Sequence, residues 1–150
     1  MEIKYFVFDA NVPLEYIFDR GHKEKVIKLF RKAANEEIIL IAPSILWDEI
    51  ANVLHSSVEN LKDIQTHMDY MEELVESQII TVMIPKKSTY MKAIEICRDG
   101  NEKSGFPEFS DSIYHALAIE NEAVFITNDR KHYLKTKQFG KIELLKEFKV

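Results

Sequence analysis

Cysteine, glycine and proline are scarce in this chain of 150 residues. The single cysteine, Cys97, excludes an intramolecular disulfide and a cysteine-based zinc site, and it fits a reducing cytoplasm. Four glycines and four prolines leave no room for a long flexible linker, so we expect one domain over residues 1–150. No apolar run approaches the roughly 20 residues of a membrane span. We therefore expect a cytoplasmic protein with neither a secretory leader nor a membrane anchor.

An excess of positive charge is also missing. The formal net charge is −5, which excludes a chain that is basic throughout. Residues 130–150 nevertheless carry seven Lys and Arg against two Glu, so the rest of the chain carries −10. This basic C-terminal segment either contacts a phosphate backbone or is an ordinary solvated surface.

The chain does contain apolar, β-rich runs that alternate with amphipathic helical patterns. We expect strands near residues 3–9, 38–42, 79–84 and 123–127, with a fifth strand at the sheet edge near 142–145. Helical patterns cover residues 23–34, 44–54, 60–76, 88–98 and 110–121, with shorter helices after residues 11 and 130. This alternation predicts an α/β fold, a three-layer α/β/α sandwich around a mainly parallel sheet of four to five strands.

Four acidic residues adjoin these elements. Asp9 ends the first strand and Asp129 the fourth, while Glu49 follows the second strand in a helix and Asp111 begins a later helix. Because strand ends in α/β folds meet at one edge of the sheet, we expect these acids to come together in space. Such a carboxylate cluster needs a cation, and Mg²⁺ prefers oxygen ligands. Each acid alone also fits an ordinary capping or surface role.

Several neighbouring residues are candidates for supporting roles. The Asn11 amide can orient a second ligand or a water beside Asp9, and Thr127 and Ser110 can hydrogen-bond metal ligands. Local turn capping is the alternative for both hydroxyls, and we expect Ser110 to be an N-cap.

Other side chains near the acids are candidates for substrate contacts. Arg130 and Lys131 directly follow Asp129 and can hold a phosphate. His115 lies four residues after Asp111, so it either touches substrate or is a buried, hydrogen-bonded histidine. Trp47 and Tyr114 can stack on a base or pack in the core. The methionines of 60–76 fit the core or a subunit contact.

At this point the chain resembles the PIN-domain ribonucleases, including VapC-type toxins of toxin–antitoxin pairs. The resemblance covers essentially the full length, and it rests on Asp9-Ala10-Asn11, Glu49, Ser110-Asp111-Ser112-Ile113-Tyr114-His115-Ala116-Leu117-Ala118 and Thr127-Asn128-Asp129. It implies Mg²⁺- or Mn²⁺-dependent cleavage of RNA at a metal site formed by the four acids. It also implies an antitoxin partner and a homodimer.

The sequence departs from the family at Asn128, where many members carry a small or basic residue, and in the acidic segment 55–80. A dehalogenase-type phosphatase would need a second Asp at the position of Asn11, and no Gly-rich phosphate loop follows the first strand. The alternative that stays open is a non-catalytic binding module with the same fold, acting through protein or RNA contacts.

Overall fold

The computed structural model describes residues 2–150 and confirms the α/β fold. Within that range all strand pairings of the sheet are parallel, and the spatial order is β3-β2-β1-β4-β5. The strands are β1 (Lys4–Phe8), β2 (Ile38–Pro43), β3 (Ile80–Met83), β4 (Val124–Thr127) and β5 (Ile142–Leu144). The fifth strand lies at the edge of the sheet, as predicted.

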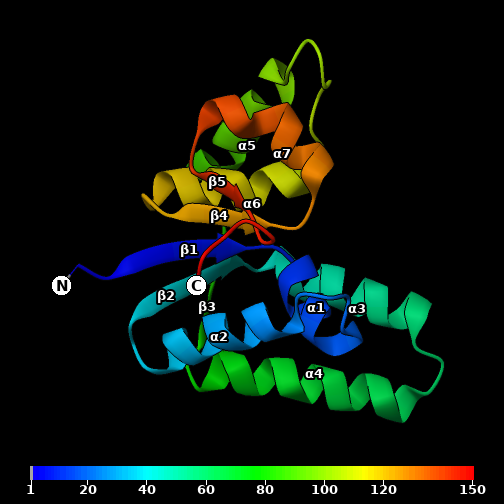
Figure 1. Ribbon diagram of the computed structural model, residues 1–150. Helices are drawn as coiled ribbons and strands as arrows, with labels where there is room; N and C mark the ends of the chain where they lie inside the picture. The colour runs from blue at the N-terminus through cyan, green and yellow to red at the C-terminus, as the bar shows by residue number, and fades with distance from the viewer. Residues whose placement is uncertain (1) are drawn as a thin grey trace.

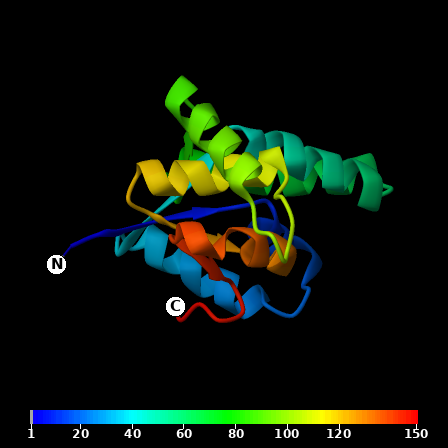
Figure 2. The same cartoon turned by 90° about the horizontal axis from the view of Figure 1, so that it is seen from above.

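Helices cover both faces of the sheet (Figures 1 and 2). One face packs against α1 (Asn11–Phe18), α2 (Lys23–Ala34), α3 (Ile45–Ser57) and α4 (Leu61–Glu76). The other face carries α5 (Lys87–Asp99), α6 (Phe109–Glu120), α7 (Arg130–Thr136) and the short 3₁₀ helix η1 (Lys137–Phe139). None of the helices in residues 2–150 is long and apolar enough to cross a membrane.

The central strand β1 is buried on both of its faces. Phe6 and Phe8 pack into the cluster shared with α1 to α4, whereas Val7 packs against α6 on the opposite side. A strand covered on both faces reads as one continuous apolar run, which is why Phe6-Val7-Phe8 shows no polar alternation.

The strand order creates a crevice next to β1. From β1 the chain moves through β2 to β3 on one side, and it later returns to place β4 and β5 on the other side. The carboxyl ends of β1 and β4 therefore flank a topological switch point, which is where α/β sheets bind their ligands. Asp9 follows β1 and Asp129 follows β4 closely, so both lie at this point.

One local prediction was wrong, and one alternative left open by the sequence is resolved. Ser110 is not an N-cap, because α6 already begins at Phe109 and Glu108 is its N-cap residue. The methionines of α4 take the first of the two expected positions, the core: Met71 is fully buried and Met68 packs against the same apolar cluster.

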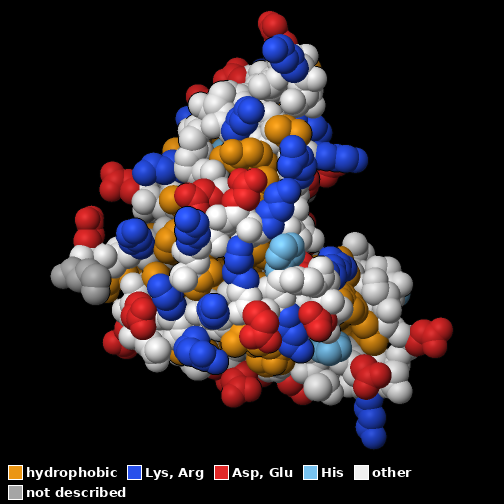
Figure 3. All heavy atoms as spheres, in the orientation of Figure 1, with side chains coloured by type: hydrophobic (Ala, Val, Ile, Leu, Met, Phe, Trp, Pro, Cys, Tyr) orange, Lys and Arg blue, Asp and Glu red, His pale blue; other side chains and the backbone are white. Residues whose placement is uncertain are grey.

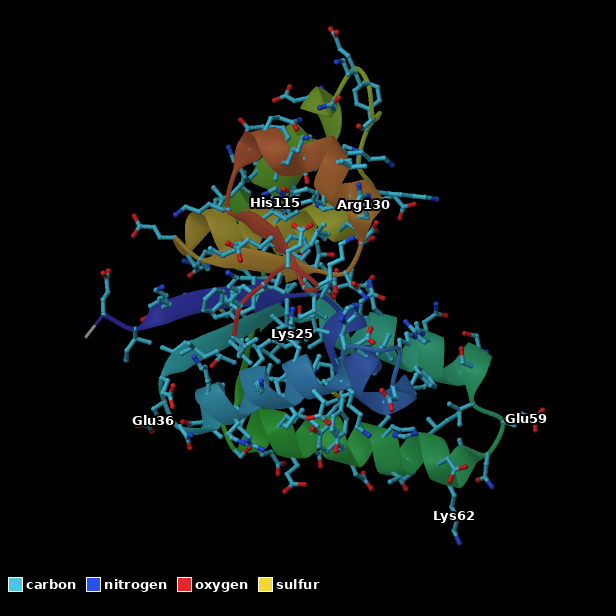
Figure 4. All side chains as sticks on the ribbon, in the orientation of Figure 1. Lys25, Glu36, Glu59, Lys62, His115 and Arg130 are labelled. Carbon is cyan, nitrogen blue, oxygen red and sulfur yellow. The ribbon has the colours of Figure 1, made fainter. Side chains whose placement is uncertain are left out.

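The end of the chain is fastened to the helical layer. The Lys25 ammonium group on α2 donates to the carbonyl oxygens of Leu145 (2.9 Å) and Lys146 (2.8 Å). Lys25 lies where the C-terminal segment passes α2 (Figure 4). This contact holds the residues after β5 against the body of the protein.

Candidate active site

Asp9 is held in place at the centre of the carboxyl edge of the sheet. Its side chain is only 4% exposed. Oδ1 accepts a hydrogen bond from the Asn11 backbone N–H (3.0 Å), and Oδ2 accepts one from the Thr127 hydroxyl (2.6 Å). Both carboxylate oxygens of Asp9 thus have a fixed direction.

Thr127 connects the two strand-end acids. Its hydroxyl donates to Asp9 and accepts from the backbone N–H of Asp129 (3.0 Å). Asp129 in turn caps α7, because its Oδ1 accepts from the His132 N–H (3.0 Å). A buried hydroxyl at the end of β4 therefore fixes the Asp9 carboxylate and the backbone that carries Asp129.

The helices α3 and α6 bring the other two acids to the same edge. The pKa of Asp9 is raised to about 7, chiefly by burial; the charges of Asp111 and Glu49 also raise it, and the bonds from Thr127 and Asn11 lower it. The pKa of Asp111 is likewise raised to about 7, chiefly by burial and also by the charges of Asp129 and Glu49. These mutual effects show that all four acids lie near one another, at a site that favours protonation or a cation.

Glu49 is hydrogen-bonded by a buried tyrosine. The Tyr114 hydroxyl on α6 donates to Oε1 of Glu49 on α3. Burial raises the pKa of Glu49, and this bond opposes the rise. Tyr114 itself is fully buried, so it does not offer its ring to a base as the sequence had suggested.

Sequence reasoning missed three further side chains near the acids. Glu108 raises the pKa of both Asp111 and Glu49 by its charge, and Lys135 on α7 lowers that of Asp111. Tyr114 was considered for stacking, not for its hydroxyl. Glu108 lies three residues before Asp111, a spacing that could have signalled a shared location.

The basic residues predicted to hold phosphate lie beside the acids on the surface. Arg130 and Lys131 form the exposed start of α7, next to Asp129 (Figure 4). Figure 3 shows an indentation on the right-hand side of the molecule, between the part built on α5 to α7 and the part built on α1 to α4. Lys and Arg side chains gather along its upper border.

His115 is not available to a substrate, so its predicted contact is corrected. Its ring is fully buried, and Nε2 lies 2.7 Å from the Gly140 carbonyl oxygen. It packs beside Phe125 and His132, beneath α7. The sequence alternative, a buried and hydrogen-bonded histidine, describes its position.

The donor atoms of the site suit a hard divalent ion. As placed in residues 2–150, no three or more His, Cys, Asp or Glu side chains are grouped to hold one metal ion jointly. Mg²⁺ does not require such a group, because it keeps several waters and often binds one or two carboxylates together with substrate phosphates. The carboxylates therefore fit a hydrated, open Mg²⁺ or Mn²⁺ site rather than a closed cage.

Solved structures of similar fold cover nearly the whole chain. DNA-bound VapBC from Salmonella typhimurium superimposes with a TM-score of 0.70 at 15% identity, covering 96% of this chain and 99% of that one. VapBC2 from Rickettsia felis, bound to a promoter DNA fragment, gives 0.69 at 16% identity over 93% and 96%. FitAcB from Neisseria gonorrhoeae gives 0.68 at 12% identity over 95% and 99%. At these identities the likeness shows the shared fold.

The sequence itself provides an independent comparison. No curated protein sequence matches the chain. The family model of the PIN domain, however, matches residues 6–137 and so spans all four acids. The chain belongs to the PIN domain family.

Proposed function

We propose that this protein is a metal-dependent endoribonuclease that hydrolyses RNA phosphodiester bonds. PIN domains are typically nucleases, and the family match covers the whole candidate site. The observation that carries the proposal is the buried Asp9 carboxylate, fixed by Asn11 and Thr127, beside the partly buried Asp111. The pKa of each is raised to about 7, in part by neighbouring carboxylates. A bound cation would relieve this accumulation of charge, which burial and repulsion otherwise oppose.

The chain's own residues have separate tasks in such a reaction. Asp9 would contact the ion most directly, and Asp111 and Asp129 would complete its surroundings, directly or through water. Glu49 would hold the ion or orient the attacking water. When bound, Mg²⁺ or Mn²⁺ supplies Lewis acidity and lowers the pKa of a coordinated water. Thr127 keeps the Asp9 carboxylate in one orientation through its 2.6 Å hydrogen bond. Asn11 supports Asp9 through its backbone N–H, and Ser110 lies within α6 one residue before Asp111.

The basic residues of α7 would bind the RNA backbone. Arg130 and Lys131 are exposed beside Asp129, and Lys135 is close enough to lower the pKa of Asp111. Cations next to an acidic, metal-binding crevice allow a polyanion to approach despite the overall charge of −5. They would hold the phosphates that flank the cleaved bond.

The proposed cellular role is that of the toxin in a type II toxin–antitoxin pair. The similar structures include VapBC assemblies and a toxin–antitoxin complex from Klebsiella pneumoniae. A cognate antitoxin would place a basic side chain among the carboxylates and so occupy the position of the ion.

The chain is also proposed to form a homodimer. Large apolar side chains are exposed along α5 and around the start of α6, namely Tyr90, Met91, Ile94, Phe106 and Phe109. Tyr90 and Phe109 stack with ring centroids 6.4 Å apart, and exposed apolar side chains gathered in this way mark interaction sites.

RNA cleavage with Mn²⁺ or Mg²⁺ tests the proposed activity. Purified wild type should cut RNA, and both Asp9→Asn and Asp111→Asn should reduce the rate by about 100-fold or more, since each removes a charged metal ligand. Asp63→Asn on the exposed face of α4 is the matched control and should cut like wild type. Expression of wild type without a partner should slow growth, and Asp9→Asn should remove that effect.

The rival interpretation makes a different set of predictions. A non-catalytic PIN-fold binding module would neither cut RNA nor bind Mn²⁺ in calorimetry, and its Asp9→Asn variant would behave like wild type. RNA cleavage that persists in EDTA would contradict the metal requirement.

A further inference from the structure

Tyr114 is built rigidly into the core below the carboxylates. Its side chain is fully buried, and its ring stacks on Phe125 of β4 with centroids 5.9 Å apart and an interplanar angle of 9°. It lies three residues after Asp111 on α6, so the two residues share one face of that helix. The ring has no room to change its direction without disturbing this packing.

The hydroxyl of Tyr114 points from this rigid ring to a more mobile acid. It donates to Oε1 of Glu49, a partly exposed residue of α3 that is 65 positions away in the sequence. A glutamate has three side-chain torsions and many accessible rotamers. A buried phenol hydroxyl needs a hydrogen-bond partner, and a bond to a charged acceptor is strong. The bond from Tyr114 therefore favours the one Glu49 rotamer that can accept it.

The bond engages one of the two carboxylate oxygens of Glu49. The phenol is the donor in this bond, because a carboxylate oxygen can only accept. Glu49 therefore keeps one oxygen free to act in the crevice.

We propose that Tyr114 is a positioning residue for the reaction: it fixes Glu49 by one carboxylate oxygen and leaves the other to orient the attacking water. This inference rests on the proposed nuclease function and assigns Glu49 to the water rather than to bidentate metal binding. The general family resemblance gave Glu49 either role, and the contact with Tyr114 leaves it no second oxygen for bidentate metal binding.

Single-turnover RNA cleavage tests the proposal with Tyr114→Phe, which keeps the ring and removes the hydroxyl. The rate should fall about 10- to 100-fold, the range expected for losing one hydrogen bond to a charged group. The Mn²⁺ affinity should stay within about threefold of wild type, since the three aspartates are unchanged. Tyr5→Phe removes an exposed phenol hydroxyl from β1 and should cleave normally.

A double-variant comparison shows whether Tyr114 acts through Glu49. Glu49→Gln should lower the rate strongly, and adding Tyr114→Phe to it should lower the rate no further. Glu49→Asp shortens the side chain and withdraws the carboxylate from Tyr114, so it should lower the cleavage rate by about as much as Tyr114→Phe. This variant replaces Tyr114→Phe in the test if Tyr114→Phe does not fold. Additive losses in the double variant, or full activity of Tyr114→Phe, would overturn the inference.

Nuclear magnetic resonance of tyrosines labelled with ¹³C at the phenol carbon provides a readout that needs no activity. The chain has six tyrosines, and the Tyr114 signal is the one that disappears in Tyr114→Phe. Glu49→Gln should shift that signal, whereas Asp63→Asn should not. A Tyr114 signal with the same chemical shift in Glu49→Gln as in wild type refutes the contact itself. If the Tyr114 signal does shift in Glu49→Gln but the wild-type protein never cuts RNA, the contact stands while the proposed function, and with it the role of Tyr114, is refuted.

Discussion

At the scale of single residues, the candidate site is defined by carboxylates that are costly to ionise. The pKa values of Asp9 and Asp111 are raised from 3.8 to about 7, in both cases chiefly by burial. The same two groups ionise near pH 4 in the unfolded chain. Between these values the folded state binds more protons than the unfolded state, so the free energy of unfolding falls as pH rises and the loss is complete above about pH 7.

This sign predicts how stability depends on pH in the absence of divalent ions. In EDTA, Asp9→Asn should become more stable relative to wild type as pH rises from about 5 to 8, because the amide resembles the protonated acid. Thermal unfolding of both proteins over this range measures the difference in Tm. Excess Mg²⁺ at pH 8 should raise the wild-type Tm and leave the variant nearly unchanged.

The comparison between variant and wild type removes a second, opposite effect. Burial lowers the pKa of His115, and it lowers that of His132 to about 4. Both histidines therefore reduce stability as pH falls below about 6.5, in wild type and variant alike. Equal Tm differences at every pH would contradict the raised pKa of Asp9.

At the scale of elements, a buried glutamate joins α1 to the loop that carries Asp129. Glu15 is fully buried; its oxygens accept from the His22 N–H (2.8 Å) and from the Asn128 side-chain amide (3.2 Å). Asn128 is one of the two places where the sequence was expected to depart from the family pattern. A carboxylate such as that of Glu15 can only accept hydrogen bonds, and the Asn128 amide supplies a donor.

Replacing the Asn128 amide by a carboxylate should weaken the contact between α1 and the loop that carries Asp129. Asn128→Asp places a second carboxylate against Glu15 and should lower the free energy of unfolding by about 2–4 kcal/mol. Adding Glu15→Gln should restore most of the loss, because the new amide can donate to the new carboxylate while its oxygen still accepts from His22. Urea unfolding of the three proteins measures this. Asn128→Ala, which removes the bond without repulsion, should fall between wild type and Asn128→Asp.

Much of this arrangement could be predicted from the sequence, because parallel strands constrain where their ends lie. The buried run before Asp9 and the strand before Asp129 were enough to place those two acids at one edge. The Tyr114–Glu49 contact was not predictable, since it depends on how α3 and α6 are rotated against the sheet. Ser110 was misplaced because α6 begins at Phe109, before the residue with the stronger capping preference.

At the scale of the whole molecule, the exposed apolar surface of α5 and α6 predicts self-association. Met91→Glu puts a charge into this surface and should convert the dimer to a monomer in light scattering, because a buried unpaired charge is costly. Leu61→Glu changes an equally apolar exposed side chain at the start of α4, on the opposite face of the sheet, and should leave the dimer intact. A wild-type monomer at high concentration would contradict the predicted dimer.

The link between Thr127 and Asp9 spans 118 positions of the chain. Asp9 is synthesised before β2 and β3, whereas β4, Thr127 and Asp129 follow only after both of these strands. During translation the N-terminal strands can pair before the strand that completes the crevice exists. A ribosome that stops before β4 therefore releases a fragment in which Asp9 lacks its hydroxyl partner and Asp129 is absent. The late position of β4 in the order of strands thus delays the assembled site until that strand has been synthesised.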